Sequence, residues 1–317
     1  MIKNPPIIKK VVKEMGGKTK EVIPKRGYFY VLLKGKKIFV SRKFSISKSF
    51  IAGREEARYK DLTHLLLEEN GLPVPKTVAF YGKTTPAEIK KRLSRFKYPI
   101  IVKDAEGSQS KGIFPNISNL KTAQKVILRA IKKTPNLIVQ EMVFGSEYRL
   151  LVLGGRLIAA TRLIPPRVTG NGKDSIKKLI QKKQKRTRGK TPFDHFLNEI
   201  LKEQGCNLKS IPPKGEIIFI RKNSSLDEGG ETEDVTDITH KKVVGTAVQA
   251  ASSVWKDLAG IDVICDDVSK SPAEQNFHII EINGKPDIYL HYNPTIGKTR
   301  NVVKEILEYI LKLKNKR

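Results

Sequence analysis

Cysteine is scarce in this sequence, and long apolar runs are absent. Its 317 residues include two cysteines, Cys206 and Cys265, which lie far apart along the chain. Because a zinc or redox site needs closely spaced ligands or a paired motif, we expect two reduced thiols with neither role. No apolar run reaches the length of a membrane span, and residues 1–14 lack the apolar core of a signal peptide. We therefore expect a cytoplasmic protein with no membrane partner.

Acidic residues are also few. The chain has 61 Lys and Arg residues against 32 Asp and Glu residues, which gives a formal net charge of +29. Such a charge favours nucleic acid as a partner. However, the excess is dispersed, and no aromatic residues interleave its local peaks at 177–190 and 312–317 to stack bases. A lysine-rich surface explains the charge better, and nucleic-acid binding stays an alternative.

Two common nucleotide-binding signatures are missing as well. Neither G-x-x-x-x-G-K-[ST] nor G-x-G-x-x-G occurs, which argues against P-loop and Rossmann folds. Instead, the apolar strand predicted at 98–104 ends in a lysine and an acid and runs into AEGSQSKG at 105–112. Glycine amides and serine hydroxyls in such a loop can bind phosphate oxygens, although an ordinary surface loop is the alternative. The candidate phosphate-binding residues are Lys103, Gly107, Ser108, Ser110 and Gly112.

Apolar periodicity predicts a mixture of strands and helices. Strand pairs are expected around the turn at 34–36 and, through Gly154-Gly155, at 147–164. Longer stretches with apolar residues every three or four positions predict helices at 55–69, 120–133, 175–183, 193–204, 240–258 and 301–313. The first should end at Asn70-Gly71 and the fifth at Gly260, and Thr85 should cap a further helix that starts at Pro86. Antiparallel hairpins mixed with helices indicate an α+β fold.

Oxygen-bearing side chains cluster on the two strands predicted at 261–265 and 276–283. Glu281 and Asn283 point to one face of the second strand, and Asp262 lies on the first. If the strands pair, the three side chains converge, and hard cations such as Mg²⁺ prefer carboxylate and amide oxygens. The alternative is a solvated polar face on an ordinary hairpin.

A third cluster begins at the end of the strand predicted at 137–141. An apolar and acidic edge here could bind an adenine base, and a following acid could bind a ribose. Arg149 and Arg162 lie on facing strands of one hairpin, and we expect them to share a face and to clamp a carboxylate or acyl phosphate. A pair of surface salt bridges is the alternative for these arginines. The candidate nucleotide contacts are Gln140, Glu141, Met142, Val143 and Glu147.

Together these segments resemble the ATP-grasp ligases of the glutathione synthetase-like branch. The likeness is greatest to the ATP-grasp portion of cyanophycin synthetase and of the bifunctional glutathione synthetases, and it runs from about residue 58 to residue 309. It rests on segments such as YPIIVKDAEGSQSKGI (98–113), GSEYRLLVLGGRLIAATRLIPP (145–166) and IIEINGKPDIYLHYNP (279–294). The resemblance implies an ATP-grasp fold, with two lobes whose antiparallel sheets clamp ATP.

The resemblance also implies domains and residue roles. A short β-rich unit at 1–55 would precede an ATP-grasp domain at 56–317, with a nucleotide-clamping lobe at about 95–145 and a catalytic lobe at about 146–317. Lys60 and Lys103 would contact phosphates beneath the loop at 107–112. Adenine would lie against 140–143 and ribose against Glu147. The reacting groups would face Arg149, Arg162 and Arg221, and the ligands of two Mg²⁺ ions, with Mn²⁺ as an alternative, would be Asp262, Glu281 and Asn283.

The implied activity is ATP-dependent joining of a carboxylate to an amine through an acyl phosphate. The substrates would be small molecules or peptides, and a ligase that modifies a protein or peptide tail is an alternative. Relatives carry a small residue and a glycine where this chain has Lys285 and Asp287, so the acceptor is open. Basic residues near the expected chemistry favour an acidic substrate. The sequence is compatible with an oligomer.

Overall fold

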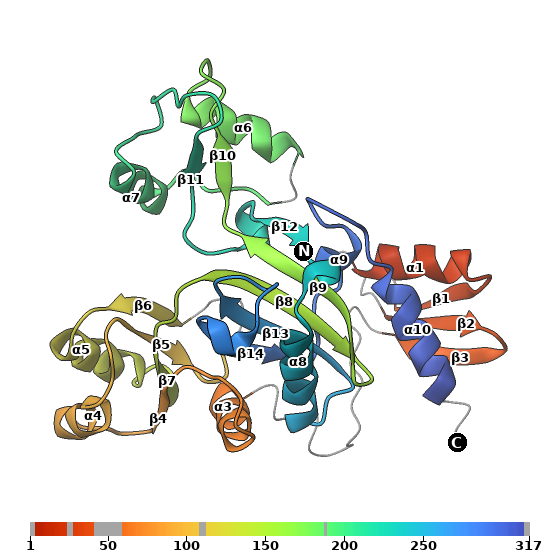
Figure 1. The fold of residues 1–317 in the computed structure, drawn as a ribbon, viewed down its shortest axis with the longest axis horizontal. Helices are drawn as coiled ribbons and strands as arrows, with labels where there is room; N and C mark the ends of the chain where they lie inside the picture. Colours follow the sequence, from red (N-terminus) through yellow and green to blue (C-terminus); the bar gives the residue numbers. More distant parts are fainter. Residues whose placement is uncertain (1–3, 24–27, 41–58, 108–111, 187–188, 314–317) are drawn as a thin grey trace.

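The computed structural model describes residues 4–23, 28–40, 59–107, 112–186 and 189–313. Around a central sheet lie a smaller sheet, a unit near the N-terminus and a projecting unit (Figure 1). Pairing between neighbouring strands is antiparallel in every sheet of the described part. The predicted α+β class is confirmed.

The central sheet has five strands in the order β12-β9-β8-β13-β14. Their bounds are β8 Ser146–Leu153, β9 Arg156–Ile164, β12 Glu231–Asp234, β13 Leu258–Cys265 and β14 Phe277–Asn283. The predicted hairpin turns at Gly154 and Gly155, which both have positive φ, as a two-residue hairpin loop requires. Apolar side chains cover both faces of β8 and β13, so these strands have nearly continuous apolar sequences. Helix α8 (Lys241–Ser253) packs on one face.

Helix α8 ends earlier than predicted. It stops at Ser253, and Trp255 has a positive φ of 50°. The chain then enters β13 at Leu258, so the prediction of a helix to residue 258 was wrong at its C-terminal end. Alanine-rich sequence gave no local signal for this early stop, which lies before the glycine at 260 that we had taken as the end.

The smaller sheet has four strands in the order β4-β7-β5-β6, namely β4 Thr77–Tyr81, β5 Ile100–Asp104, β6 Ile113–Ile117 and β7 Asn136–Glu141. Helices α4 (Pro86–Leu93) and α5 (Leu120–Ala130) pack on it and share its apolar core. Thr85 caps α4 as expected, because its hydroxyl accepts from the Glu88 amide at 3.2 Å. Because β4 belongs to this sheet, the sheet begins before residue 95, where the nucleotide-clamping lobe was expected to start.

The unit near the N-terminus contains the predicted hairpin, β2 (Tyr28–Leu33) and β3 (Lys36–Val40), with β1 (Lys18–Ile23) added. It also contains helix α1 (Asn4–Glu14), which the sequence analysis missed. Two prolines follow its first residue, and proline is tolerated in a first helical turn. Buried side chains of α1 share a core with β8 and with α10 (Val302–Leu313).

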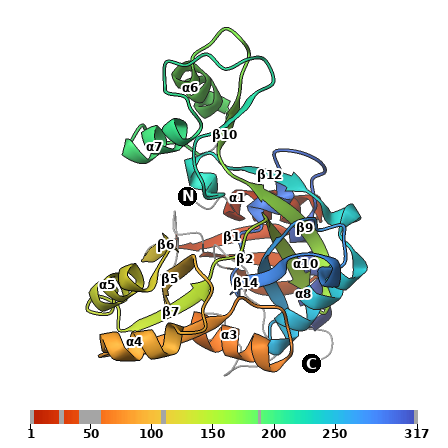
Figure 2. The same ribbon diagram turned by 60° about the vertical axis from the view of Figure 1, so that its left-hand side comes forward.

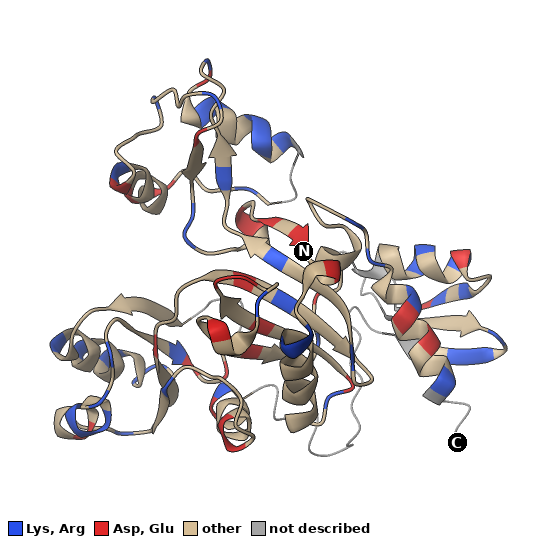
Figure 3. Ribbon diagram, viewed as in Figure 1, with Lys and Arg blue, Asp and Glu red and all other residues tan. Residues whose placement is uncertain are grey.

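The projecting unit is built on β10 (Arg167–Thr169) and β11 (Ile217–Phe219), with α6 (Ile176–Arg186) and α7 (His195–Glu203). It extends away from the central sheet in both ribbon views (Figures 1 and 2). Lys and Arg are spread over the helices of all the units rather than gathered on one of them (Figure 3). None of the helices in the described ranges is long and apolar enough to span a bilayer.

Helix α3 (Lys60–Glu69) lies where the two main sheets meet. It contacts β4 of the smaller sheet and both β14 and α8 of the central unit. The helix ends at Asn70-Gly71 as predicted, and residues 55–58 of the predicted helix lie outside the described ranges. The short helix α9 (Tyr289–Tyr292) follows β14 and packs on β9.

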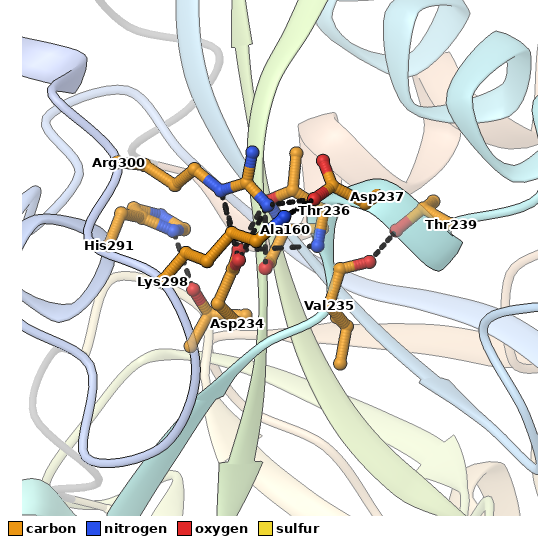
Figure 4. A network of polar contacts seen from close by, with 10 residues as sticks. Ala160, Asp234, Val235, Thr236, Asp237, Thr239, His291, Lys298 and Arg300 are labelled. Carbon is orange, nitrogen blue, oxygen red and sulfur yellow. Dashed lines mark hydrogen bonds and ion pairs between the residues drawn. The ribbon is translucent and has the colours of Figure 1, made fainter.

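A polar network fastens the segment after α9 to β12 (Figure 4). The carboxylate of Asp234 accepts from the Arg300 guanidinium at 2.6 Å and from the Thr236 hydroxyl at 2.5 Å. Asp237 pairs with both Arg300 and Lys298. Burial would raise the pKa of Asp234, but the hydrogen bonds from Arg300 and Thr236 outweigh it, and the pKa lies below its ordinary value. Arg300 therefore links the segment after α9 to Asp234 of β12 and to Asp237.

Replacement of Arg300 should expose the cost of that buried carboxylate. We expect Arg300→Met to lower the free energy of unfolding by about 3 kcal/mol, because Asp234 has only 5% of its side chain exposed and would lose its partner. Its pKa is lowered by folding, so the loss should persist at neutral pH and fade below about pH 4. Urea unfolding of both proteins at neutral and acidic pH measures the difference in the free energy of unfolding.

Lys298→Met is the matched control for that prediction. Its ion pair with Asp237 is exposed on both sides, so solvent screens it and its loss should lower the free energy of unfolding much less. Equal losses in the two variants would contradict the structural role of Arg300.

Candidate active site

Three charged residues lie side by side on one face of the central sheet. Asp262 of β13 is the register partner of Arg149 on β8 and of Glu281 on β14. Directly paired residues in antiparallel strands share a face, so the three side chains lie together. An irregularity in the β13–β14 pairing leaves Ile280 as the extra residue, and this bulge brings Glu281 opposite Asp262. The predicted convergence of these strands is thus present.

A buried ion pair joins the first two of these residues. Arg149 donates to Asp262 through Nε and through Nη2, the latter at 2.8 Å, and its Nη1 group makes no hydrogen bond to any described residue. Gly260 makes room for two side chains, because a Cβ at that position would lie 3.0 Å from both the Arg149 Cδ and the Pro286 Cβ. Glycine at this point in the strand is therefore explained by the close approach of Arg149 and Pro286.

Asp262 sits among other acids as well as beside its arginine. Burial raises the pKa of Asp262 above the ordinary aspartate value, the Arg149 guanidinium opposes that rise, and the carboxylates of Glu281 and Glu147 add to it. Nearby negative charge of this kind favours binding of a cation.

The predicted metal ligands do converge, although not as a dedicated acidic cage. The Asn283 amide donates to Asp262 Oδ2 at 2.9 Å, and Glu281 has 41% of its side chain exposed. Among the described residues, no group of three or more His, Cys, Asp and Glu side chains is arranged for a metal. Two carboxylates and an amide suit Mg²⁺, which keeps several waters and binds through one or two carboxylates together with substrate phosphates.

Lys60 connects the segment that ends at Gly107 to this face. Its ammonium group donates to the Gly107 carbonyl and lies 3.8 Å from Glu281 Oε1. Gly112 has a φ of +72°, and its carbonyl accepts from the Asp104 amide at 3.1 Å. The predicted contacts Ser108 and Ser110 lie outside the described residues.

Lys103 approaches the same place from the smaller sheet. Its ammonium donates to Gln140 Oε1 at 2.8 Å, with no direct carboxylate partner among the described residues. Burial lowers the pKa of Lys103, the Glu281 carboxylate opposes that effect, and Lys60 adds to it. This buried ammonium has no carboxylate within hydrogen-bond range among the described residues, so it could bind an anion such as a phosphate.

The predicted adenine contacts differ among themselves. Gln140 is buried, and its side chain points inward to Lys103, His64 and Thr77, so this side-chain geometry gives its predicted adenine contact no support. The Glu141 carboxylate accepts from the Lys97 amide at 2.8 Å. Met142 and Val143 lie on the crossing between the two sheets, and Glu147 lies on β8 near Arg149. Roles for these four stay predictions.

Arg162 is not on the site face. The register pairs it with Tyr148, whereas Arg149 pairs with Thr161, so the two arginines point to opposite faces of the hairpin. The expectation of a shared face was wrong by one residue of register, which local sequence did not fix. Arg162 instead contacts Ser146 at 3.1 Å and Glu233 at 3.7 Å.

Arg221 is buried in the projecting unit. Its guanidinium binds Asp194 at 2.9 Å and Glu228 at 3.1 Å, and it also donates to the carbonyls of Pro192 and Ile220. These partners use the guanidinium structurally, so the predicted role at the reacting groups is not supported here. Lys285 is exposed, and Asp287 accepts from the Tyr289 amide at the start of α9. The basic cluster expected to select an acidic substrate is therefore not assembled.

Two buried histidines escaped the sequence analysis. His64 of α3 contacts Gln140 and Thr77, and His291 of α9 contacts the Thr161 hydroxyl at 2.7 Å. Thr161 is the register partner of Arg149, so His291 lies against the site face. For His64 a signal was available, since a polar residue stood on the helix face otherwise marked by apolar spacing.

Comparison with known proteins agrees with this arrangement. Residues 66–183 match the family model described as D-ala D-ala ligase C-terminus. The chain is 31% identical over 275 residues to cyanophycin synthetase of Geminocystis herdmanii, which covers 83% of this chain and 31% of that protein. It is 33% identical over 263 residues to the glutathione biosynthesis bifunctional protein of Clostridium perfringens, covering 79% of this chain and 33% of the relative.

A solved structure supports the fold independently. The crystal structure of a bifunctional glutathione synthetase from Pasteurella multocida aligns with a TM-score of 0.75 at 23% identity, over 98% of this chain and 44% of that one. The chain spans about a third of the length of the curated relatives it matches. With these similarities, the chain has an ATP-grasp fold and is similar over most of its length to parts of ATP-grasp ligases that include cyanophycin synthetase and the bifunctional glutathione synthetases.

Proposed function

We propose that this protein is an ATP-dependent carboxylate–amine ligase that forms an amide bond through an acyl phosphate and releases ADP and phosphate. The observation that carries the proposal is the convergence of Arg149, Asp262 and Glu281 on one face, beside two lysines that approach from α3 and the smaller sheet. An ATP-grasp fold uses its two sheets to enclose the nucleotide. Substrate phosphates and metal ions would meet at this junction.

Charge balance supports two divalent ions. Lys60, Lys103 and Arg149 supply three positive charges, and Glu147, Asp262 and Glu281 supply three negative charges, so the named groups cancel. ATP carries about four negative charges at neutral pH, and two divalent cations would cancel them. Binding of ATP with two Mg²⁺ ions therefore preserves neutrality, whereas bare ATP would leave a buried excess of negative charge. Mn²⁺ has similar ligand preferences and is the alternative.

In the proposed reaction, a carboxylate oxygen of the first substrate attacks the γ-phosphorus, and ADP leaves. The amine of the second substrate then attacks the acyl carbon, phosphate leaves, and the amine gives up its proton. Bound Mg²⁺, held by Asp262, Glu281 and Asn283, would neutralise phosphoryl oxygens. Lys60 and Lys103 would bind phosphates, and the Nη1 group of Arg149 is available to a developing negative charge.

Alternatives differ in substrate and in class. A ligase acting on a protein or peptide tail would use the same site, and an amino-acid or peptide carboxylate is proposed because the relatives are named for cyanophycin and glutathione synthesis. A basic nucleic-acid-binding protein would not require charged residues in register across three strands. Binding of nucleic acid that weakens steeply with salt, without ATP turnover, would favour that alternative.

The metal assignment predicts a loss of turnover when the exposed ligand Glu281 is changed. Glu281→Gln should lower kcat by about 100-fold or more while leaving unfolding unchanged, because it removes a ligand charge and keeps the shape. ADP release with an amino-acid and dipeptide panel measures it. Glu305→Gln is the control, since Glu305 lies on α10, pairs with Arg156 at the start of β9 away from the site, and should keep full turnover. Normal ADP release by the Glu281 variant would contradict the metal assignment.

The assignment of Lys103 to phosphate binding predicts a loss of ATP affinity when this lysine is removed. Lys103→Ala should weaken ATP affinity by about 10- to 100-fold, the value of a hydrogen bond to a charged group, with little loss of stability. Lys97→Ala, which removes an exposed lysine of the same lobe, should leave affinity unchanged. Titration calorimetry with ATP and Mg²⁺ provides the measurement, and equal affinities in the two variants would reject the assignment.

A further inference from the structure

A chain of hydrogen bonds runs behind the proposed phosphate site. It begins at the Pro75 carbonyl, which accepts from the Thr77 hydroxyl at 2.8 Å. Thr77 Oγ1 lies 3.1 Å from His64 Nδ1 and 3.4 Å from His64 Nε2, and the latter nitrogen meets the Gln140 amide nitrogen. Gln140 Oε1 then accepts from the Lys103 ammonium at 2.8 Å. The chain therefore joins α3 to β4, β7 and β5.

The two ends of this chain fix the direction of every bond. A carbonyl can only accept, and an ammonium can only donate. Thr77 must therefore give its proton to Pro75, so its oxygen accepts from His64 Nδ1–H. His64 Nε2 is then bare and accepts from the Gln140 amide, which also contacts the Thr77 oxygen at 3.0 Å. This leaves the Gln140 carbonyl oxygen facing Lys103.

Only one form of the imidazole satisfies this pattern, the neutral ring with its proton on Nδ1. Burial and the charge of Lys103 lower the pKa of His64 to about 4, which agrees with a neutral ring. A second ring proton would meet the Gln140 amide protons. Rotation of that amide would relieve the clash, but it would turn N–H groups toward the Lys103 ammonium.

The position of His64 links this chain to the other lysine. Lys60 and His64 are four residues apart and share one face of α3. Both line a small pocket between α3 and β14, together with Glu281. One face of α3 thus carries Lys60, a candidate phosphate ligand, and His64, which contacts the glutamine that binds the second candidate, Lys103.

We infer that His64 is a positioning residue, which through Gln140 directs the Lys103 ammonium toward the phosphates of ATP. The inference rests on the proposed function, because it assumes that Lys103 binds phosphate. Gln140, expected from sequence to touch the adenine, serves instead as the connector between the imidazole and the lysine. The role of the histidine is indirect, since it contacts neither substrate nor reacting atoms.

A binding cycle with the Mg²⁺ complex of a non-hydrolysable ATP analogue tests the inference. His64→Leu should weaken binding about tenfold, equivalent to about 1.4 kcal/mol, and His64→Gln should restore most of it because its amide offers both an acceptor and a donor. Ile127→Val, a packing change in the core of the smaller sheet, should have no effect on affinity. In a Lys103→Ala background, His64→Leu should cause no further loss.

The possible outcomes distinguish failure of the inference about His64 from failure of the proposed function. A full tenfold loss from His64→Leu in the absence of Lys103 would overturn the inference, because the histidine would then act elsewhere. Unchanged affinity in His64→Leu would overturn it while leaving the proposed function intact. Failure of the unmodified protein to bind the analogue would overturn both.

A second measurement needs no nucleotide. The ¹⁵N resonances of the His64 ring in the free protein should show a protonated Nδ1 and a bare Nε2 at neutral pH. A ring protonated on Nε2, or on both nitrogens, would overturn the inference even if the protein folds and binds ATP normally.

Discussion

The buried ion pair between Arg149 and Asp262 is the constraint on which the rest of the structure depends. Transfer of two charges into a sheet interior costs several kcal/mol per ion, so the pair persists only with good geometry and further donors. Gly260 opens the space for the arginine, and Asn283 adds a hydrogen bond to the carboxylate. Because the side chains on a strand alternate, the same register that buries apolar residues of β8 and β13 under α8 places this pair on the opposite face.

From that pair the site extends to the smaller sheet through α3 and the crossing that follows β7. Lys60 lies between the Gly107 carbonyl and Glu281, and Lys103 is held by Gln140. A movement of α3 would therefore displace groups contributed by both sheets. This arrangement connects the fold of an ATP-grasp protein to its chemistry, because the cations come mainly from one side and the carboxylates from the other.

Sequence predicted the parts of this account that depend on local pattern. Alternation placed Glu281 and Asn283 together, the glycine pair fixed the β8–β9 hairpin, and Thr85 marked the start of α4. Sequence analysis failed where the position of a side chain depends on contacts between segments that are distant in the sequence. The one-residue register that separates Arg162 from Arg149 has no local signature, and neither do the partners that occupy Arg221. The inward position of the Gln140 side chain had no local signal either, because its contact with His64 depends on a helix far away in sequence.

Acyl-phosphate formation is the central claim, and hydroxylamine trapping tests it most directly. The purified protein would be incubated with ATP, Mg²⁺, a panel of amino acids and dipeptides, and hydroxylamine in place of the amine. The account predicts a hydroxamate of the accepted carboxylate, formed in equal amount with ADP and phosphate. Release of AMP and pyrophosphate with the hydroxamate would indicate an acyl adenylate instead, and ADP release without any hydroxamate across a panel that supports turnover would contradict the proposed ligase chemistry.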